Sequence, residues 1–417
     1  MVLDSSTALE CFVQSSAKPY HSSSSIVFWL LTFAYFLSYF FRSTNAVIAP
    51  DLTRELNLSP GDLGLMTSLF YFAFAAGQIP IGLALDRFGT RAVQPMLLGI
   101  AVLGSLLFSV AHSLVVLAVA RMLLGLGLAG CLMVAFKSFG FWFPRAQNAT
   151  VTGALMALGT FGALFAASPL AWLSSVSGWR SVFVYGAGLT ALSAVLIAVF
   201  VRNAPRDWKP PTMTSTSTQQ FKLDSRLVRI SLVNFFTAGG LLSVQTLWGG
   251  ERFLSSVYGL DKGGAGVLLT IMGLGTAAGY LLSGWLGDRL GIARVAVVGI
   301  SGFCACQLAF ALRVPLALIY PIYFLYGAFG TSNLLLLSHA KSLYPLGLTG
   351  RVTTFANMFG IGGTFLLQWL IGLIVGAFSS DPLILEPFGF TVAFGLLALG
   401  TTITLLLYLP VARAFKA

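Results

Sequence analysis

The chain has 417 residues, of which 57% are apolar and only 9% are charged, and its mean hydropathy is +0.88. No soluble domain of this length tolerates such a composition, which therefore excludes a soluble protein and predicts the lipid bilayer as solvent. A net charge of +11 would suit a nucleic-acid partner, but the basic residues alternate from loop to loop and form no patch. We expect a membrane protein without a nucleic-acid partner.

Twelve apolar runs approach the roughly 20 residues that a membrane-spanning helix needs. They cover residues 26–49, 61–83, 92–111, 114–136, 151–173, 181–201, 230–248, 264–286, 295–312, 314–337, 352–377 and 388–410. The sequence thus divides into an N-terminal tail (1–25), a six-helix bundle (26–201), a linker (202–229), a second six-helix bundle (230–410) and a C-terminal tail (411–417). The linker is polar and punctuated by prolines, so it is too hydrophilic to enter lipid.

The basic residues predict the orientation of the chain. Of the 24 Lys and Arg, 17 fall in loops or helix ends on the side of the tails and the linker, five fall on the other side, and Arg42 and Arg121 lie within spans. Because cytoplasmic loops are enriched in Lys and Arg, both termini and the linker are expected in the cytoplasm.

One signature occurs twice, 202 residues apart, as Gly82-Leu-Ala-Leu-Asp86-Arg87-Phe-Gly89-Thr-Arg91 and as Gly284-Trp-Leu-Gly-Asp288-Arg289-Leu-Gly291-Ile-Ala-Arg294. The repeat extends to Gly125 and Gly327 and, with a one-residue slip, to Gly162 and Gly363. Such glycines are expected to let neighbouring membrane helices approach closely. A duplicated helical unit of half the chain length is typical of transporters.

These residues resemble the major facilitator superfamily, whose loop between the second and third helices carries Gly-x-x-x-Asp-Arg-x-Gly-x-Arg. Arg121-Met-Leu-Leu-Gly125 in the fourth span extends the resemblance. It implies an all-α membrane protein with twelve transmembrane helices in two pseudo-symmetric six-helix bundles, which works by alternating access.

Within that superfamily, Tyr39-Phe-Phe-Arg42-Ser-Thr-Asn45 looks like the organic-anion branches, the anion/cation symporters and the organophosphate antiporters. The symporters usually place Asp before this arginine, where the chain has Phe41. The antiporters usually have a second arginine in the seventh span, whereas the repeat partner of Arg42 is Val244. Neither mechanism carries over intact.

The duplicated signature is expected to act as a conformational latch. Asp86 near a helix end can accept hydrogen bonds in an outward-open state and must release them when the halves rock. Gly82 permits close helix contact, Gly89 a tight turn, and Arg87 anchors the cytoplasmic surface. Asp288 and Arg289 are the corresponding residues of the second copy.

Arg42 is the strongest candidate for a substrate-binding residue, because a guanidinium within a span is costly and is usually kept for a substrate, an ion path or a partner. Counting about 1.5 Å per residue, Arg42 and Arg121 each lie about 10 Å below the outer end of their span. All 13 Asp and Glu fall in tails, loops or span ends, so no carboxylate is available at mid-membrane. We therefore expect an electropositive site whose anionic substrate is gripped by Arg42 and assisted by Arg121, although a structural role for Arg121 is an equal alternative.

Further candidates share the depth of this site. Tyr35, Tyr39 and Asn45 follow the helical spacing of Arg42, and Gln245, Trp248 and Asn357 lie at comparable depth in the seventh and eleventh spans. A polar stripe of this kind also serves helix packing. His339, like Glu251 and Lys137, is a titratable group near a helix end; His339 is a candidate for proton coupling, with snorkelling as the alternative.

No phosphate-binding loop, metal-ligand cluster or nucleophile arrangement occurs, so the sequence predicts neither an enzyme nor a cofactor nor a metal site. It predicts a monomeric secondary transporter of a small or medium organic anion in a bacterial inner membrane, using exchange or a co-transported proton or other ion. Two alternatives stay open at this point: an exporter of amphipathic compounds such as drugs or siderophores, and a transporter-like sensor that signals through residues 202–229.

Overall fold

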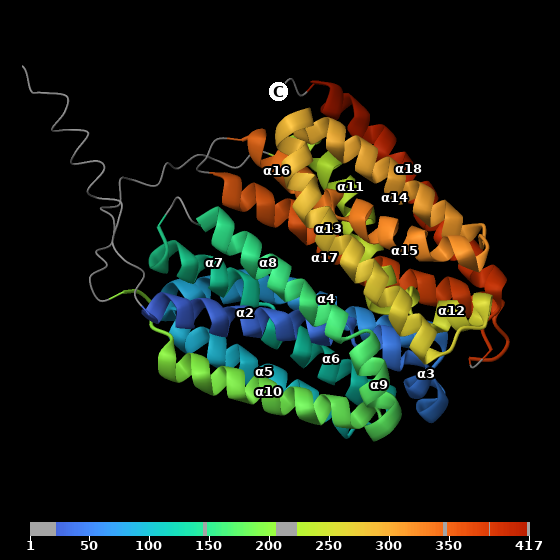
Figure 1. The fold of residues 1–417 in the computed structure, drawn as a ribbon, viewed down its shortest axis with the longest axis horizontal. Coiled ribbons are helices and arrows are strands. Elements are labelled where there is room, and N and C mark those ends of the chain that lie inside the picture. Colours follow the sequence, from blue (N-terminus) through green and yellow to red (C-terminus); the bar gives the residue numbers. More distant parts are fainter. Residues whose placement is uncertain (1–21, 145–147, 206–222, 345–347, 383, 415–417) are drawn as a thin grey trace, which may run out of the picture.

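The computed structural model describes residues 22–144, 148–205, 223–344, 348–382 and 384–414, and every regular element in these ranges is a helix (Figure 1). The first half contains α2 (Ser22–Ser43), α3 (Asn45–Leu56), α4 (Pro60–Phe88), α5 (Thr90–Ser109), α6 (Leu114–Leu128), α7 (Cys131–Trp142), α8 (Asn148–Phe165), α9 (Ser168–Ser177) and α10 (Trp179–Phe200). The second half contains α11 (Ser225–Ser243), the π-helix η2 (Val244–Trp248), α12 (Glu251–Tyr258), α13 (Lys262–Leu290), α14 (Ile292–Ala311), α15 (Leu316–Gly330), α16 (Ser332–Ser342), α17 (Thr349–Phe378) and α18 (Pro387–Ala414).

The prediction of an all-helical membrane protein is confirmed. Within the described ranges, 11 helices are long and apolar enough to cross a membrane. The predicted span 314–337 is not among them; its residues form α15 and α16, which are separated at Thr331. Eleven of the twelve predicted spans thus have a counterpart among the described residues. The spans 114–136 and 151–173 are likewise each built from two helices, α6 with α7 and α8 with α9.

The two halves lie against each other as two helix bundles, blue to green below and yellow to red above in Figure 1. We call the end where α10 finishes and α11 starts the linker end, and the opposite end, with α3, α9 and α12, the distal end. The predicted linker 202–229 falls largely outside the described residues, and the tail 1–25 does so almost entirely. The domain boundaries stay predictions.

The second long helix of each half is built in the same way. Helices α4 and α13 both have 29 residues. Ser59 caps α4 and Asp261, at the equivalent position, caps α13 by accepting a backbone N–H 2.8 Å away. Both helices end at a glycine with positive φ, 76° at Gly89 and 91° at Gly291, a conformation that is costly for residues with a Cβ. The residues that cap the start of this helix and the glycine that ends it are therefore repeated in the two halves, as the signature is.

The repeated glycines bring equivalent helices into backbone contact. A Cβ at Gly125 would lie 2.1 Å from the Phe70 carbonyl oxygen on α4, and one at Gly327 would lie 2.1 Å from the Met272 carbonyl oxygen on α13. Gly162 and Gly363 likewise pack on the Phe36 and Phe235 carbonyls of α2 and α11. Close helix packing, as expected for small residues in membranes, explains these glycines.

The first helix of each half is discontinuous near its middle. Helix α2 ends at Ser43 and α3 resumes at Asn45, whereas α11 passes into η2 and then into Gly249 and Gly250 before α12. Arg42 and its repeat partner Val244 both lie at these interruptions. Interrupted helices at the centre of a repeat protein commonly surround the binding site of a transporter.

Substitution Gly125→Ala is expected to lower the free energy of unfolding by about 1–3 kcal/mol, because its methyl group must displace the α4 backbone. Gly188→Ala is the matched control, since no atom lies within 4 Å of a Cβ at that position on α10. Thermal unfolding of the purified variants measures the difference. Equal stability of the two variants would contradict the packing role of Gly125.

Candidate functional site

Arg42 lies in the last turn of α2 among aromatic rings. Its guanidinium carbon is 4.8 Å from the ring centre of Tyr39, 5.1 Å from that of Phe74 and 6.0 Å from that of Tyr71. Arginine over an aromatic face is held by the ring quadrupole. The nearest helices of the first half therefore position the cation without neutralising its charge.

The polar contacts of Arg42 are sparse. One guanidinium nitrogen donates to the Ser38 hydroxyl at 3.5 Å, and Nε is buried without a hydrogen-bond partner. No Asp or Glu forms an ion pair with Arg42 in the part of the chain that the structure describes. The electropositive site itself stays a prediction.

Tyrosines from both halves border Arg42. The Tyr35 hydroxyl is 3.4 Å from that of Tyr39 on the same face of α2. From the second half, Tyr280 on α13 interacts with Tyr39 and Arg42 and also with Asn333 on α16. The Asn333 Oδ1 atom is buried without a hydrogen-bond partner. The structure thus places hydroxyl and amide groups of the second half opposite the arginine of the first.

Tyr71, Phe74, Tyr280 and Asn333 were not predicted from the sequence. Each lies in an apolar span in which other aromatic or amide residues are common, so composition and helical spacing do not single it out. Tyr71 and Phe74 are identified by their contact with Arg42 within the first half. Tyr280 and Asn333 are identified by interactions that depend on how the two halves pack against each other.

Asn45 and Arg121 point into the first half. Asn45 is fully buried and donates to the Thr67 hydroxyl of α4 at 2.7 Å. Arg121 on α6 is also fully buried, donates to the Phe41 carbonyl at 2.9 Å, and lies over the rings of Phe108 and Phe183. These contacts favour a packing role for both residues over direct contact with a substrate.

The predicted residues of the second half are dispersed. Gln245 is buried in η2, and Trp248 is fully buried with its indole N–H donating to the Gln368 carbonyl at 2.7 Å. Asn357 is exposed on α17. Trp248 is therefore hydrogen-bonded within the second half, and the roles of Gln245, Trp248 and Asn357 in substrate binding stay predictions.

A polar chain across the halves passes through η2 instead. The Tyr71 hydroxyl donates to Thr246 at 3.2 Å, and the Gln368 amide donates to the same hydroxyl at 3.1 Å. Because Tyr71 also borders Arg42, this chain connects the arginine with the interruption of the second half.

His339 lies on α16 within the second half. Its Nδ1 atom is 2.7 Å from the Tyr408 hydroxyl of α18, and the imidazole is buried. Its repeat partner Lys137 binds Asp86 at 2.7 Å. The two halves therefore use this repeat position differently, and the proton-coupling role of His339 stays a prediction.

The signature lies at the linker end, where the side chains of Asp86, Arg87 and Arg289 are exposed to solvent. The Asp86 side chain is 79% exposed and pairs with Lys137 of its own half. Nothing lies within 4 Å of a Cβ at Gly82, while Gly89 packs on Asn203. Arg87 lies over Phe88, and Arg289 lies over Trp285, both arginines being exposed. The Asp288 side chain is outside the described part of the chain.

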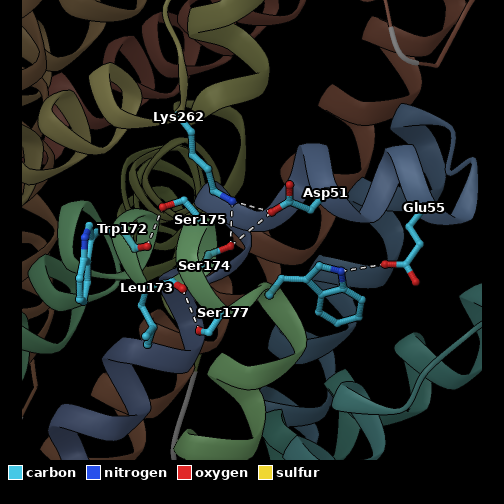
Figure 2. A network of polar contacts seen from close by, with 9 residues as sticks. Asp51, Glu55, Trp172, Leu173, Ser174, Ser175, Ser177 and Lys262 are labelled. Atoms are coloured by element: carbon cyan, nitrogen blue, oxygen red, sulfur yellow. Dashed lines mark hydrogen bonds and ion pairs between the residues drawn. The ribbon is translucent and has the colours of Figure 1, made fainter.

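The distal end, in contrast, is closed by ion pairing between the halves (Figure 2). Lys262 Nζ of α13 is 2.5 Å from Asp51 Oδ2 of α3 and 2.8 Å from Ser174 Oγ of α9. About two turns further along α13, the hydroxyls of Thr270 and Ser168 add a 3.0 Å contact. We call Asp51, Ser174 and Lys262 the distal lock.

Backbone contacts reinforce the distal lock. A Cβ at Gly250 would lie 2.0 Å from the Ala46 carbonyl oxygen, and one at Gly372 would lie 2.4 Å from the Pro60 carbonyl oxygen. Pro50 has no N–H to donate to the Ala46 carbonyl four residues earlier, so that oxygen is available at the surface of α3. Glycine at position 250 therefore lets α12 and α3 meet.

Comparison with known proteins agrees with this architecture. The family model described as Major Facilitator Superfamily matches residues 31–366. The probable sulfoacetate transporter SauU of Cupriavidus necator is 27% identical over 303 residues, which are 66% of this chain and 70% of that protein. The probable L-galactonate transporter of Escherichia coli is 27% identical over 315 residues, 69% of this chain and 68% of that protein.

Solved structures show the same fold. A bacterial homologue of the human lysosomal transporter Spinster, crystallised in an inward-facing and unoccupied conformation, superposes with a TM-score of 0.78 at 20% identity over 96% of this chain and 98% of its own. A D-xylose-proton symporter gives a TM-score of 0.76 at 14% identity over 93% of this chain and 97% of its own.

Substitution Arg121→Met is expected to lower the free energy of unfolding by about 1–3 kcal/mol, because the buried Phe41 carbonyl loses its donor. Arg294→Met, at an exposed arginine, is the control. Thermal unfolding and ligand binding are measured on both. A variant of Arg121 with unchanged stability and abolished ligand binding would place this arginine in the binding site instead.

Proposed function

Because the chain belongs to the Major Facilitator Superfamily, we propose that it is a secondary transporter that moves a small or medium organic anion by alternating access, with Arg42 as its anion-binding residue. The observation that carries the proposal is the guanidinium of Arg42, which has aromatic neighbours but no carboxylate partner among the described residues.

The chemistry of that guanidinium favours an acidic solute. A cation removed from water and left without a counter-ion is unfavourable, and a carboxylate, sulfonate or phosphate group supplies the opposite charge. The planar fork of arginine binds two oxygens of such a group at once. A neutral solute would leave the charge uncompensated.

The neighbours of Arg42 favour a solute that also carries hydroxyl groups. Tyr35, Tyr39 and Tyr280 offer hydroxyls, and Asn333 Oδ1 is a buried acceptor without a partner. Buried polar atoms of this kind bind tightest to a ligand that satisfies them. Relatives named for L-galactonate and sialic acid transport support a hydroxylated acid.

Alternating access gives the two ends different roles. The excess of Lys and Arg on the side of the linker supports a cytoplasmic linker end, so the distal end faces outward. The distal lock then closes the outer side, while Asp86 pairs within its own half at the inner side. This arrangement corresponds to an inward-facing state in which the latch is released, and bacterial relatives support the inner membrane as location.

Substitution Arg42→Ala is expected to reduce uptake or efflux of an organic anion by about 100-fold, because a charge-assisted contact worth about 3 kcal/mol is lost. Purified protein in proteoliposomes, assayed with a panel of labelled hydroxy acids and an imposed pH gradient, measures this flux. Arg294→Ala, at an exposed arginine of the linker end, should transport normally. Normal flux through Arg42→Ala would refute the site.

Substitution Asp86→Asn is expected to slow transport about tenfold while changing the thermal stability of the inward-facing state by less than about 1 kcal/mol, because an exposed ion pair contributes little to stability. The substitution is expected to destabilise the outward-open state instead, because Asp86 accepts hydrogen bonds from its latch partner in that state. Flux and thermal unfolding are measured on the same preparation. Wild-type flux in this variant would contradict the latch.

A further inference from the structure

Glu251 is a half-buried residue at the closed distal end, and one oxygen of its carboxyl group is fully buried. It is the first residue of α12, directly after Gly250, whose backbone packs on the Ala46 carbonyl of α3. Its Oε2 atom is buried and accepts no hydrogen bond within the described part of the molecule. An ionised carboxylate in that position would lack the donors that normally stabilise its charge.

Two of the three cations near Glu251 bind other groups. Lys262 of α13 binds Asp51 and Ser174, and Arg252 on the same helix as Glu251 donates to the Pro382 carbonyl. Asp51 of α3 repels an ionised Glu251, while Lys262, Arg54 of α3 and Arg252 attract it. None of the ion pairs of the described residues includes Glu251. Its carboxyl group therefore has charged neighbours but no direct counter-ion.

Burial outweighs these attractions. Removal from water raises the pKa of Glu251 to about 7, with the charge of Lys262 opposing the rise and that of Asp51 adding to it. A cavity of about 390 Å³, lined in part by Asp51, Arg54 and Ser174, lies beside the distal lock. Through it solvent reaches the charged residues that surround Glu251.

We propose that Glu251 is a proton-binding site of the outer gate, protonated while the distal lock is closed and ionised once the gate opens. The assignment of this end as outer rests on the proposed function. Closing the gate thus takes up one proton from the outer solution, and acid outside favours the inward-facing state.

The sign follows from linkage. In the open gate a hydrated Glu251 has its usual pKa of 4.5, whereas in the closed gate its pKa is about 7. The closed state therefore binds more protons between these values, and its population rises as the pH falls. Lowering the pH from about 8 to about 5.5 should raise the ratio of closed to open gates by about 25-fold.

Distance measurement between spin labels tests the proposal without a substrate. Exposed positions Val176 on α9 and Val267 on α13 take cysteine labels in a chain whose own cysteines are replaced by alanine. The short-distance population should grow on acidification of the wild-type background. Glu251→Gln, a mimic of the protonated form, should stay closed at both pH values, and Glu386→Gln, at an exposed carboxylate, should respond as the wild type does.

An unchanged distance distribution of the wild-type background between the two pH values, or a Glu251→Gln variant that keeps the response, would overturn the proposal. The distance measurement does not depend on transport. A protein that shows the pH response but no anion transport would support the proton site and refute the proposed function. A protein that transports an anion but shows no pH response would support the proposed function and refute the proton site.

Discussion

The proposed function depends on the guanidinium of Arg42, which lies inside the protein without a carboxylate partner among the described residues. Arg42 lies at the break between α2 and α3, supported by Tyr39, Phe74 and Tyr71 rather than by a carboxylate. Aromatic faces offset part of the cost of removing the charge from water but leave it able to attract an anion. The guanidinium of Arg121 is likewise enclosed by rings and has two nitrogens without a hydrogen-bond partner, but it donates to a backbone carbonyl of its own half. We assign substrate binding to Arg42 and packing to Arg121.

Some features are shared by the two halves of the chain, whereas others occur in one half only. The repeated glycines, caps and positive-φ turns give both halves the same helix contacts, and rigid halves are what a rocking motion requires. Outside the signature, several charged residues do not repeat: Arg42 corresponds to Val244, and Lys137, which binds Asp86, corresponds to His339, which binds Tyr408. The distal lock likewise joins α3 and α9 of one half to α13 of the other. The residues to which we assign specificity and gating thus lie where the repeats differ.

The fold was largely predictable from the sequence, because apolar run length and the 202-residue repeat follow directly from the bilayer and from duplication. The interruption of the predicted span 314–337 at Thr331 was not, since hydropathy does not report a local break. At the site, sequence placed Arg42, Tyr35 and Tyr39 on one face, and the structure keeps them together. The positions of Tyr280, Asn333 and the distal lock depend on how the two halves pack against each other. The spacing of residues along a single helix does not predict this packing. Asn45 and Trp248 have helical spacing or depth compatible with the site but donate to neighbouring helices.

In the proposed function, the negative charge of the solute compensates the positive charge of the Arg42 guanidinium. Thermal unfolding of the purified wild-type protein, measured with a panel of hydroxylated carboxylates and with the neutral amide of each, tests it most directly. At least one carboxylate should raise the unfolding temperature in a saturable way, and its amide should leave that temperature unchanged, because the uncharged head leaves the guanidinium without a counter-ion. Equal stabilisation by an acid and its amide would contradict the account.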